Sequence, residues 1–161
     1  AVRSIFSTMS PAECRDVLGR NHVARLAFWN GTRVDIRPLA YVATGAWIFL
    51  RTAPGEKIAA TAHRPYVALE ADEVDGPFDW RSVVVHGSIY MLAEDGSPIE
   101  QRELRRAIAE LRRLMPQAFT AQDPVPERDI VCGIHIHEIS GKAASTSRPP
   151  ALSRRRRRIA R

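Results

Sequence analysis

The sequence predicts a mainly β protein, a small antiparallel barrel of six strands with short helices at its openings. Six apolar or alternating runs of strand length are separated by turn-forming pairs such as Asn30-Gly31 and Pro54-Gly55. Three segments have helical character, but they do not alternate with the strands as they would in a parallel α/β sheet. With 161 residues, the chain is long enough for one domain with its own core.

The first predicted element is a short helix at "SPAECRDVL". Ser10 can cap its N-terminus, Pro11 suits its first position and Glu13 completes a capping box. Gly19 is a residue at which such a helix commonly stops. We therefore expect a helix from about Pro11 to Gly19.

A hairpin is predicted next. The run "HVARLAFW" (22–29) and the run "TRVDIRPLAYV" (32–42) alternate as half-buried strands do, and Asn30-Gly31 between them is a strong hairpin signal. Pro38 has no N–H to donate to a neighbouring strand. The second run is therefore expected to have an edge, an end or a bulge at Pro38.

The rest of the domain follows the same logic of apolar period and turn residues. The last helix has the clearest signature, because Ser97, Pro98 and Glu100 repeat the capping pattern ahead of an apolar stripe. The expected elements are a strand at 46–52, a helix at 56–64, a strand at 66–74, a loop at 74–80, a strand at 82–92, a helix at 97–115 and a strand at 129–140.

The basic charge of the chain is concentrated at its C-terminal end. Its net charge is +6, yet eight basic and no acidic residues lie from Lys142 onward, which leaves 16 basic and 18 acidic residues before it. The composition shifts toward Ser, Pro and Arg from Ala143. We expect a domain over residues 1–145 and a flexible basic tail over residues 146–161. Because the body is not basic, nucleic-acid or membrane contact through the Arg tail is not expected to be the function.

The remaining composition predicts a cytoplasmic protein. No apolar run approaches the ~18 residues of a membrane span, and the N-terminal residues do not have the pattern of a signal peptide. Cys14 and Cys132 are expected to be reduced and buried. His135 and His137 share one face of a strand, but spacing places no further ligand beside them, so no metal site is predicted. Hydrolase, NTPase and Rossmann motifs are absent from the sequence.

The stretch "FLRTAPGEK" allows two interpretations. Arg51, Thr52, a flexible Gly55 and Lys57 lie where a strand passes into a predicted helix, and together they offer the donors that bind a phosphate. In the alternative, Arg51 pairs with a surface acid and Lys57 is a solvated residue of the helix's first turn. The stretch alone leaves both open.

The ordered motifs resemble a known family. "VARLAF", "RPLAYV", "FLRTAPGEK", the block "DEVD" followed by "WRSVVVHG", and "ISGKA" occur in sequence between about residues 5 and 145. In this order they are similar to the FMN-binding split β-barrel family of pyridoxamine 5′-phosphate oxidase-like flavoproteins, and most similar to its nitroimidazole-resistance (Nim-type) branch. The resemblance implies a six-stranded split β-barrel that forms a homodimer and binds FMN between its subunits.

The resemblance also implies a set of contact residues. The strand from Asp35 to Ala40 should run beside the flavin ring, and Lys57 should hold the phosphate. Glu56 stands where many relatives have a second basic residue. The full set of implied cofactor-binding residues is Arg37, Pro38, Leu39, Ala40, Leu50, Arg51, Thr52, Lys57, Trp80, Ser82 and Val83.

The implied activity is transfer of electrons or hydride from NADH or NADPH to a small acceptor, with the flavin supplying the redox chemistry. No side chain in the sequence is marked as a general acid or base, so the catalytic residues and the substrate stay open. Two alternatives also stay open: a flavin carrier or sensor without turnover, and a related barrel that binds a deazaflavin or haem.

Overall fold

A computed structural model describes residues 3–55 and 65–147 of the chain. Within this part the chain forms eight strands and two helices, so the predicted mainly β class is confirmed. The elements are β1 Arg3–Thr8, α1 Pro11–Arg20, β2 Val23–Trp29, β3 Val34–Ala40, β4 Val42–Thr44, β5 Trp47–Thr52, β6 Tyr66–Gly76, β7 Asp79–Met91, α3 Pro98–Leu114 and β8 Ile130–Ser147.

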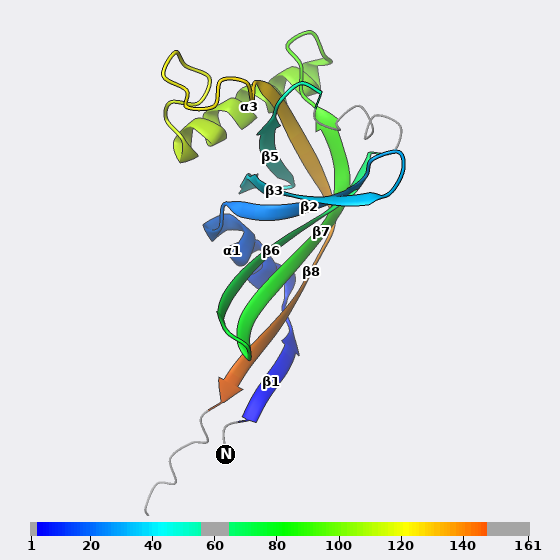
Figure 1. Ribbon diagram of the computed structural model, residues 1–161, viewed down its shortest axis with the longest axis vertical. Helices are drawn as coiled ribbons and strands as arrows, with labels where there is room; N and C mark the ends of the chain where they lie inside the picture. Colours follow the sequence, from blue (N-terminus) through cyan, green and yellow to red (C-terminus); the bar gives the residue numbers. More distant parts are fainter. Residues whose placement is uncertain (1–2, 56–64, 148–161) are drawn as a thin grey trace, which may run out of the picture.

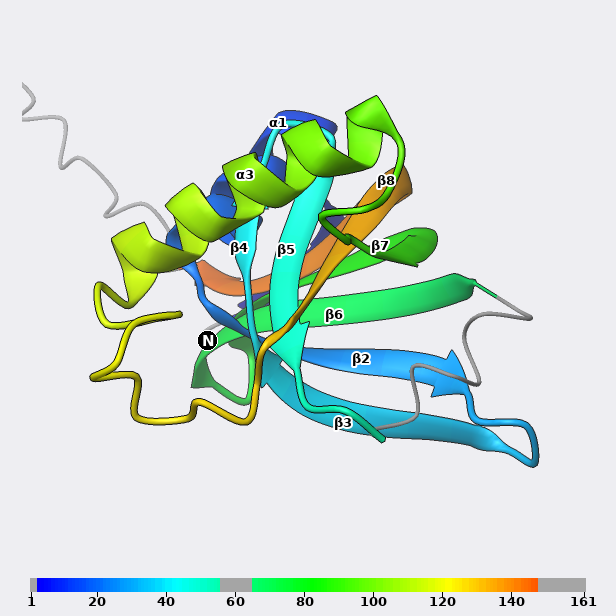
Figure 2. The ribbon, with the colours of Figure 1, turned by 90° about the horizontal axis from the view of Figure 1, so that it is seen from above.

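All the strands belong to one curved antiparallel sheet. Its order is β3-β2-β6-β7-β8-β5-β4, and β1 pairs with the far end of β8. In Figure 1 the hairpin of β6 and β7 extends downward as an arm together with β1 and the end of β8, while β2, β3 and β5 form the upper half. Figure 2 shows α3 lying across β4 and β5.

Both helices of the described residues begin as their sequences predict, and the helix predicted at 56–64 lies outside the described residues. In α1 the Ser10 hydroxyl accepts from the Glu13 N–H at 3.2 Å, and the Glu13 carboxylate accepts from the Ser10 N–H at 2.7 Å. Ser97 and Glu100 make the same reciprocal pair at the start of α3. The first helix ends at Arg20, one residue beyond the expected glycine stop. Among the described residues, no helix is both long and apolar enough to cross a membrane.

The apolar core has two parts. The larger one lies between α1 and the curved sheet, where Tyr41 is fully buried and donates its hydroxyl to the Leu18 carbonyl at 2.9 Å. The smaller one lies under α3 and includes Phe49, Leu104 and Leu111. Cys14 and Cys132 are free thiols inside the core, which confirms their predicted burial.

Two predicted boundaries are wrong. Residues 74–80 are not an open loop, because β6 runs to Gly76 and β7 starts at Asp79, with Gly76 pairing with Asp79. The strand β8 continues through Ser147, beyond the predicted strand end at residue 140 and beyond the composition shift. Pairing with β1, a strand that the sequence pattern did not reveal, extends β8 through this polar stretch. Within the described residues the strand count is therefore eight rather than six, since β4 also separates from β3.

Candidate functional site

The first part of the predicted flavin site, residues 35–40, lies on β3 at the open edge of the sheet. Only β2 pairs with β3 among the described strands, so the other edge of β3 has no strand partner there. Most of its side chains are exposed, and Val34 and Ile36 are 65% and 61% exposed. Pro38 thus lies on an edge strand, one of the three positions that the sequence allowed.

The hydrogen-bond alternation shows which backbone groups this edge offers. Tyr41 donates its N–H to the His22 carbonyl, and Asn30 donates to the Arg33 carbonyl at the opposite end of the pair. Because bonded pairs alternate in an antiparallel ladder, residues 35, 37 and 39 face β2 while Val34, Ile36, Pro38 and Ala40 face outward. Pro38 has no N–H, and the Ile36 N–H donates to the Asp35 carboxylate at 2.9 Å. Ala40 is the outward-facing donor within the predicted segment 37–40.

The second part lies on β5. Leu50 is 3% exposed and belongs to the core, and its backbone pairs with Cys132 of β8. Thr52 is half-buried at the end of the strand, and Gly55 follows with a left-handed φ of +80°. Lys57, the predicted phosphate ligand, lies outside the described residues.

The Arg51 guanidinium makes a buried ion pair. Its Nη1 and Nη2 donate to the two carboxylate oxygens of Asp123 at 2.5 and 2.9 Å, and the side chains are only 9% and 3% exposed. The guanidinium also lies 5.0 Å from the centre of the Phe119 ring and 3.4 Å from the Met115 sulfur. Of the two interpretations of this residue, the structure shows the ion pair, although the acid is buried rather than at the surface.

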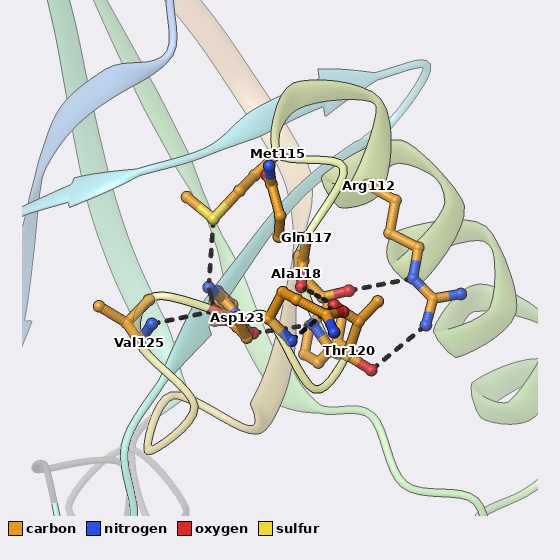
Figure 3. Close-up of polar contacts among 10 residues, drawn as sticks. Arg112, Met115, Gln117, Ala118, Thr120, Asp123 and Val125 are labelled. Carbon is orange, nitrogen blue, oxygen red and sulfur yellow. Dashed lines mark hydrogen bonds and ion pairs between the residues drawn. The ribbon is translucent and has the colours of Figure 1, made fainter.

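The Asp123 carboxylate organises the loop between α3 and β8 (Figure 3). It accepts from the N–H groups of Phe119 and Val125 at 2.8 and 3.0 Å. Arg51 first, and then these two N–H groups, hold the pKa of Asp123 well below its usual range. Arg112 of α3 closes the same loop by donating to the Ala118 carbonyl at 3.1 Å. The loop is thus fixed against the end of β5.

The third part of the predicted site lies on the arm. Trp80 is half-buried on β7, with its ring 6.3 Å from that of Phe6 on β1. The Ser82 hydroxyl donates to the Glu70 carboxylate at 2.8 Å, and Val83 is fully buried. On the arm, a ligand could therefore contact the indole of Trp80 and the hydroxyl of Ser82, which already donates a hydrogen bond to Glu70.

One chain does not bring all the predicted residues together. Arg51 pairs with Val131 on β8, whereas Ser82 pairs with Lys142 on the same strand. Eleven residues of strand correspond to about 36 Å along β8 at ~3.3 Å per residue. In Figure 1 the arm and β5 lie at opposite ends of the molecule. The residues thus form two groups, one from β3 and β5 and one from the arm.

The histidines on β8 have aromatic neighbours. The His135 ring lies 5.1 Å from the Trp47 ring, and His137 lies 3.2 Å from the Ser88 hydroxyl and 6.3 Å from the Tyr66 ring. Within residues 3–55 and 65–147, no three His, Cys, Asp or Glu side chains are grouped to hold a metal ion.

Asp123 is the residue near the predicted site that sequence analysis missed. It lies 72 positions from Arg51, in a Pro-containing loop with no periodic pattern. A single sequence contains no signal that links the two residues. Only the fold brings this loop beside β5.

This curved antiparallel sheet with an open edge and a projecting arm defines the split β-barrel class. A sequence profile described as pyridoxamine 5′-phosphate oxidase matches residues 10–143, and the chain belongs to this family. An uncharacterized protein of Rhizobium meliloti (strain 1021) is 34% identical over 79 residues, which are 49% of this chain. The match spans about half of that curated relative, 52% of its length.

Solved structures show the same fold. A structure described as an FAD-binding protein from Mesorhizobium loti is 28% identical, covers 88% of this chain and 99% of its own, and has a TM-score of 0.69. A candidate 5-nitroimidazole antibiotic resistance protein from Bacteroides thetaiotaomicron has a TM-score of 0.63 and covers 91% of this chain and 90% of its own. At 14% identity that second likeness concerns the fold alone.

Proposed function

We propose that this protein is a flavoprotein that binds FMN between the two subunits of a homodimer. The match of the pyridoxamine 5′-phosphate oxidase profile across residues 10–143 is the observation that carries the proposal. The Mesorhizobium loti structure, similar over nearly all of its length, is described as FAD-binding, which supports a flavin as the class of cofactor.

The open edge of β3 fits the rim of a flavin ring. Outward carbonyls and the Ala40 N–H supply polar groups, and the exposed side chains of Val34 and Ile36 supply apolar surface beside them. In a dimer, the arm of one subunit would complete the group on β3 and β5 of the other. This arrangement would explain why one chain separates Trp80 and Ser82 from Thr52.

The phosphate is assigned to Lys57 and to the backbone after Thr52 rather than to the Arg51 side chain. The two terminal nitrogens of the Arg51 guanidinium already make a bidentate contact with Asp123. In this proposal, Arg51 positions the end of β5 by joining it to the loop at 115–129.

The flavin, when bound, would supply the electron or hydride chemistry, and the chain would bind and orient it and exclude water. We propose that reduced nicotinamide, NADH or NADPH, is the electron donor and that a small molecule is the acceptor, in a cytoplasmic setting. Among the described residues of the proposed site, Asp35 and the Ser82–Glu70 pair lie in internal contacts, so no side chain is assigned as a general acid or base.

The first experiment measures the absorbance spectrum of the protein as purified and titrates the apo form with FMN, FAD and riboflavin. Flavin bands and tightest binding of FMN are expected. A haem or deazaflavin spectrum would show that the cofactor is not a flavin. Tighter binding of FAD than of FMN would show that the flavin is FAD. Anaerobic addition of NADH or NADPH then tests the activity. Persistence of the oxidised bands would favour a carrier or sensor over an oxidoreductase.

The phosphate assignment gives a separate prediction. Lys57→Ala should weaken FMN binding by about 1.5–3 kcal/mol, the usual value of a hydrogen bond to a charged group. Riboflavin, which has no phosphate, is the matched ligand, and its affinity should not change. Fluorescence titration measures both, and equal loss for the two ligands would contradict the role of Lys57.

A further inference from the structure

A cavity of about 240 Å³ lies between the first turns of α3 and the sheet. Side chains from four elements line it: Trp47 of β5, Tyr90 of β7, His135 of β8, and Glu100 and Glu103 of α3. The cavity is small compared with a typical cofactor pocket. It lies beside β5 and β8, on residues that the flavin proposal does not use.

Three aromatic rings line this cavity. The Trp47 ring meets the His135 ring at 5.1 Å and 69°, and the Tyr90 ring at 6.2 Å and 61°. Phe49 stacks on Trp47 at 6.1 Å and 8°, which fixes the indole. A Cβ on Gly133 would lie 3.0 Å from the indole, so the glycine lets Trp47 lie against the backbone. The rings are thus held at steep angles to one another around a shared space.

Glu103, which also lines the cavity, has a buried carboxylate. The Glu103 side chain is 5% exposed, and its Oε2 has no hydrogen-bond partner among the described residues. Arg106 lies 3.5 Å from Oε2 and Arg102 lies 3.4 Å from Oε1, both longer than the ~2.7–2.9 Å of a well-formed charged pair. Arg106 directs another nitrogen to the Thr44 hydroxyl at 3.0 Å. Glu103 is therefore a buried anion whose Oε1 accepts two long hydrogen bonds from Arg102 and whose Oε2 accepts none from the described residues.

Aromatic ring faces and a poorly compensated carboxylate attract the same chemical class. Ring faces are negative and bind alkylammonium groups, most strongly where water is excluded. A buried anion without good partners is costly, and a cation placed beside it reduces that cost. We propose that this cavity binds a small organic cation of the quaternary-ammonium class, independently of any flavin.

The experiment uses choline and its neutral isostere 3,3-dimethylbutan-1-ol, which differ in charge but hardly in shape. Isothermal titration of the protein as purified, at low ionic strength, should show choline binding in the millimolar range or tighter, and binding of the alcohol at least about tenfold weaker. No heat of binding with choline at about 10 mM, or equal affinity for the alcohol, would overturn the proposal.

Two substitutions assign the binding to this cavity. Glu103→Gln keeps the shape and removes the charge, and Tyr90→Leu removes a ring face from a residue that is 45% exposed. Each should weaken choline binding about tenfold. Glu110→Gln, on the same helix and outside the cavity lining, is the matched control and should change nothing.

Unaltered choline affinity in Glu103→Gln and Tyr90→Leu would contradict the site. If Glu103→Gln does not fold, Tyr90→Leu decides alone. The flavin content of each variant is recorded as a separate readout, so that failure of the flavin proposal and failure of this one are distinguished.

Discussion

The ion pair of Arg51 and Asp123 should affect the stability of the fold differently from the exposed ion pairs of the molecule. Its partners are almost completely buried, so removing one leaves a desolvated charge behind. Arg113 and Glu110 on α3 form a pair whose side chains are 78% and 24% exposed. An exposed pair of this kind contributes little because solvent screens it.

Asp123→Asn should therefore destabilise the protein strongly, whereas Glu110→Gln should change the free energy of unfolding by less than about 1 kcal/mol. Urea denaturation followed by tryptophan fluorescence measures both. Asp123→Asn should also loosen the loop at 115–129, visible as faster amide hydrogen exchange of Phe119 and Val125, whose N–H groups bond to Asp123. A urea midpoint equal to that of Glu110→Gln would show that the buried pair is not needed.

Glu73 gives the fold a defined dependence on acid. The Arg20 guanidinium, with help from Asn21 and Arg81, lowers the pKa of Glu73 from 4.5 to about 2. A carboxylate whose pKa is lower in the folded state than in the unfolded state stabilises the fold. This stabilisation is complete when the pH is above the unfolded-state pKa, and it is lost as the pH falls through the folded-state pKa. Its contribution should be complete above about pH 5 and should disappear toward pH 2.

Unfolding by urea at pH 6 and pH 3 tests this contribution. The urea midpoint of the wild type should be lower at pH 3 than at pH 6. In Glu73→Gln this decrease in the midpoint should be smaller. Because Glu73 joins α1 to β6, the variant should already be less stable at pH 6. The same acid loss in both proteins would exclude Glu73 as a source of it.

The bulge between β7 and β8 leaves no room for a side chain at Gly87. The pairing shifts between His86 and Gly87, and a Cβ on Gly87 would overlap the His135 carbonyl oxygen. A backbone atom cannot move aside as a side chain can. Gly76, at the β6–β7 turn, has open space where a Cβ would lie, with nothing within 4 Å, and is the matched site.

Gly87→Ala should consequently lower the free energy of unfolding by about 1–3 kcal/mol or more, as overpacking does. Gly76→Ala should leave it nearly unchanged. Thermal unfolding by circular dichroism compares the two variants. Equal melting temperatures would mean that the bulge can relax to admit a methyl group.

The local elements of this fold follow from local chemistry. The caps at Ser10 and Ser97 and the turn at Asn30-Gly31 involve residues within four positions, so the sequence predicts them directly. The strand β1 could not be found in this way, because "RSIFST" has little apolar pattern and is ordered by pairing with β8, about 140 residues later. The partner of Arg51 was hidden for the same reason.

The candidate site was likewise predictable where it depends on local chemistry and not where it depends on distant pairing. Pro38 indicated an edge, an end or a bulge because proline cannot donate a hydrogen bond, and among the described strands β3 is an edge. The family motifs named residues on β3, β5 and β7, but motif order contains no distances. That Trp80 and Ser82 lie on an arm remote from β5 depends on the long register of β7 with β8. Only a three-dimensional arrangement reveals it.

The whole molecule exposes apolar side chains where the proposed partner subunit would bind. Val34 and Ile36 on β3 are 65% and 61% exposed, Phe6 on the arm is 66% exposed, and Tyr66 at the start of β6 is 73% exposed. Surfaces of this kind commonly mark interfaces, and a stable one buries about 1,200–2,000 Å². We therefore expect a dimer in solution, with the open edge of β3 within or beside the contact.

Ile36→Lys should convert this dimer to a monomer, because it places a charge on a surface that the partner would desolvate. If the flavin lies between the subunits, the bound flavin should be lost in the same variant. Leu114→Lys, at the end of α3 and 37% exposed, is the control and should keep both. Size-exclusion chromatography with light scattering gives the mass, and absorbance gives the flavin content. A monomeric variant that retains its flavin would place the cofactor within one chain, and a monomeric wild type would remove the shared site altogether.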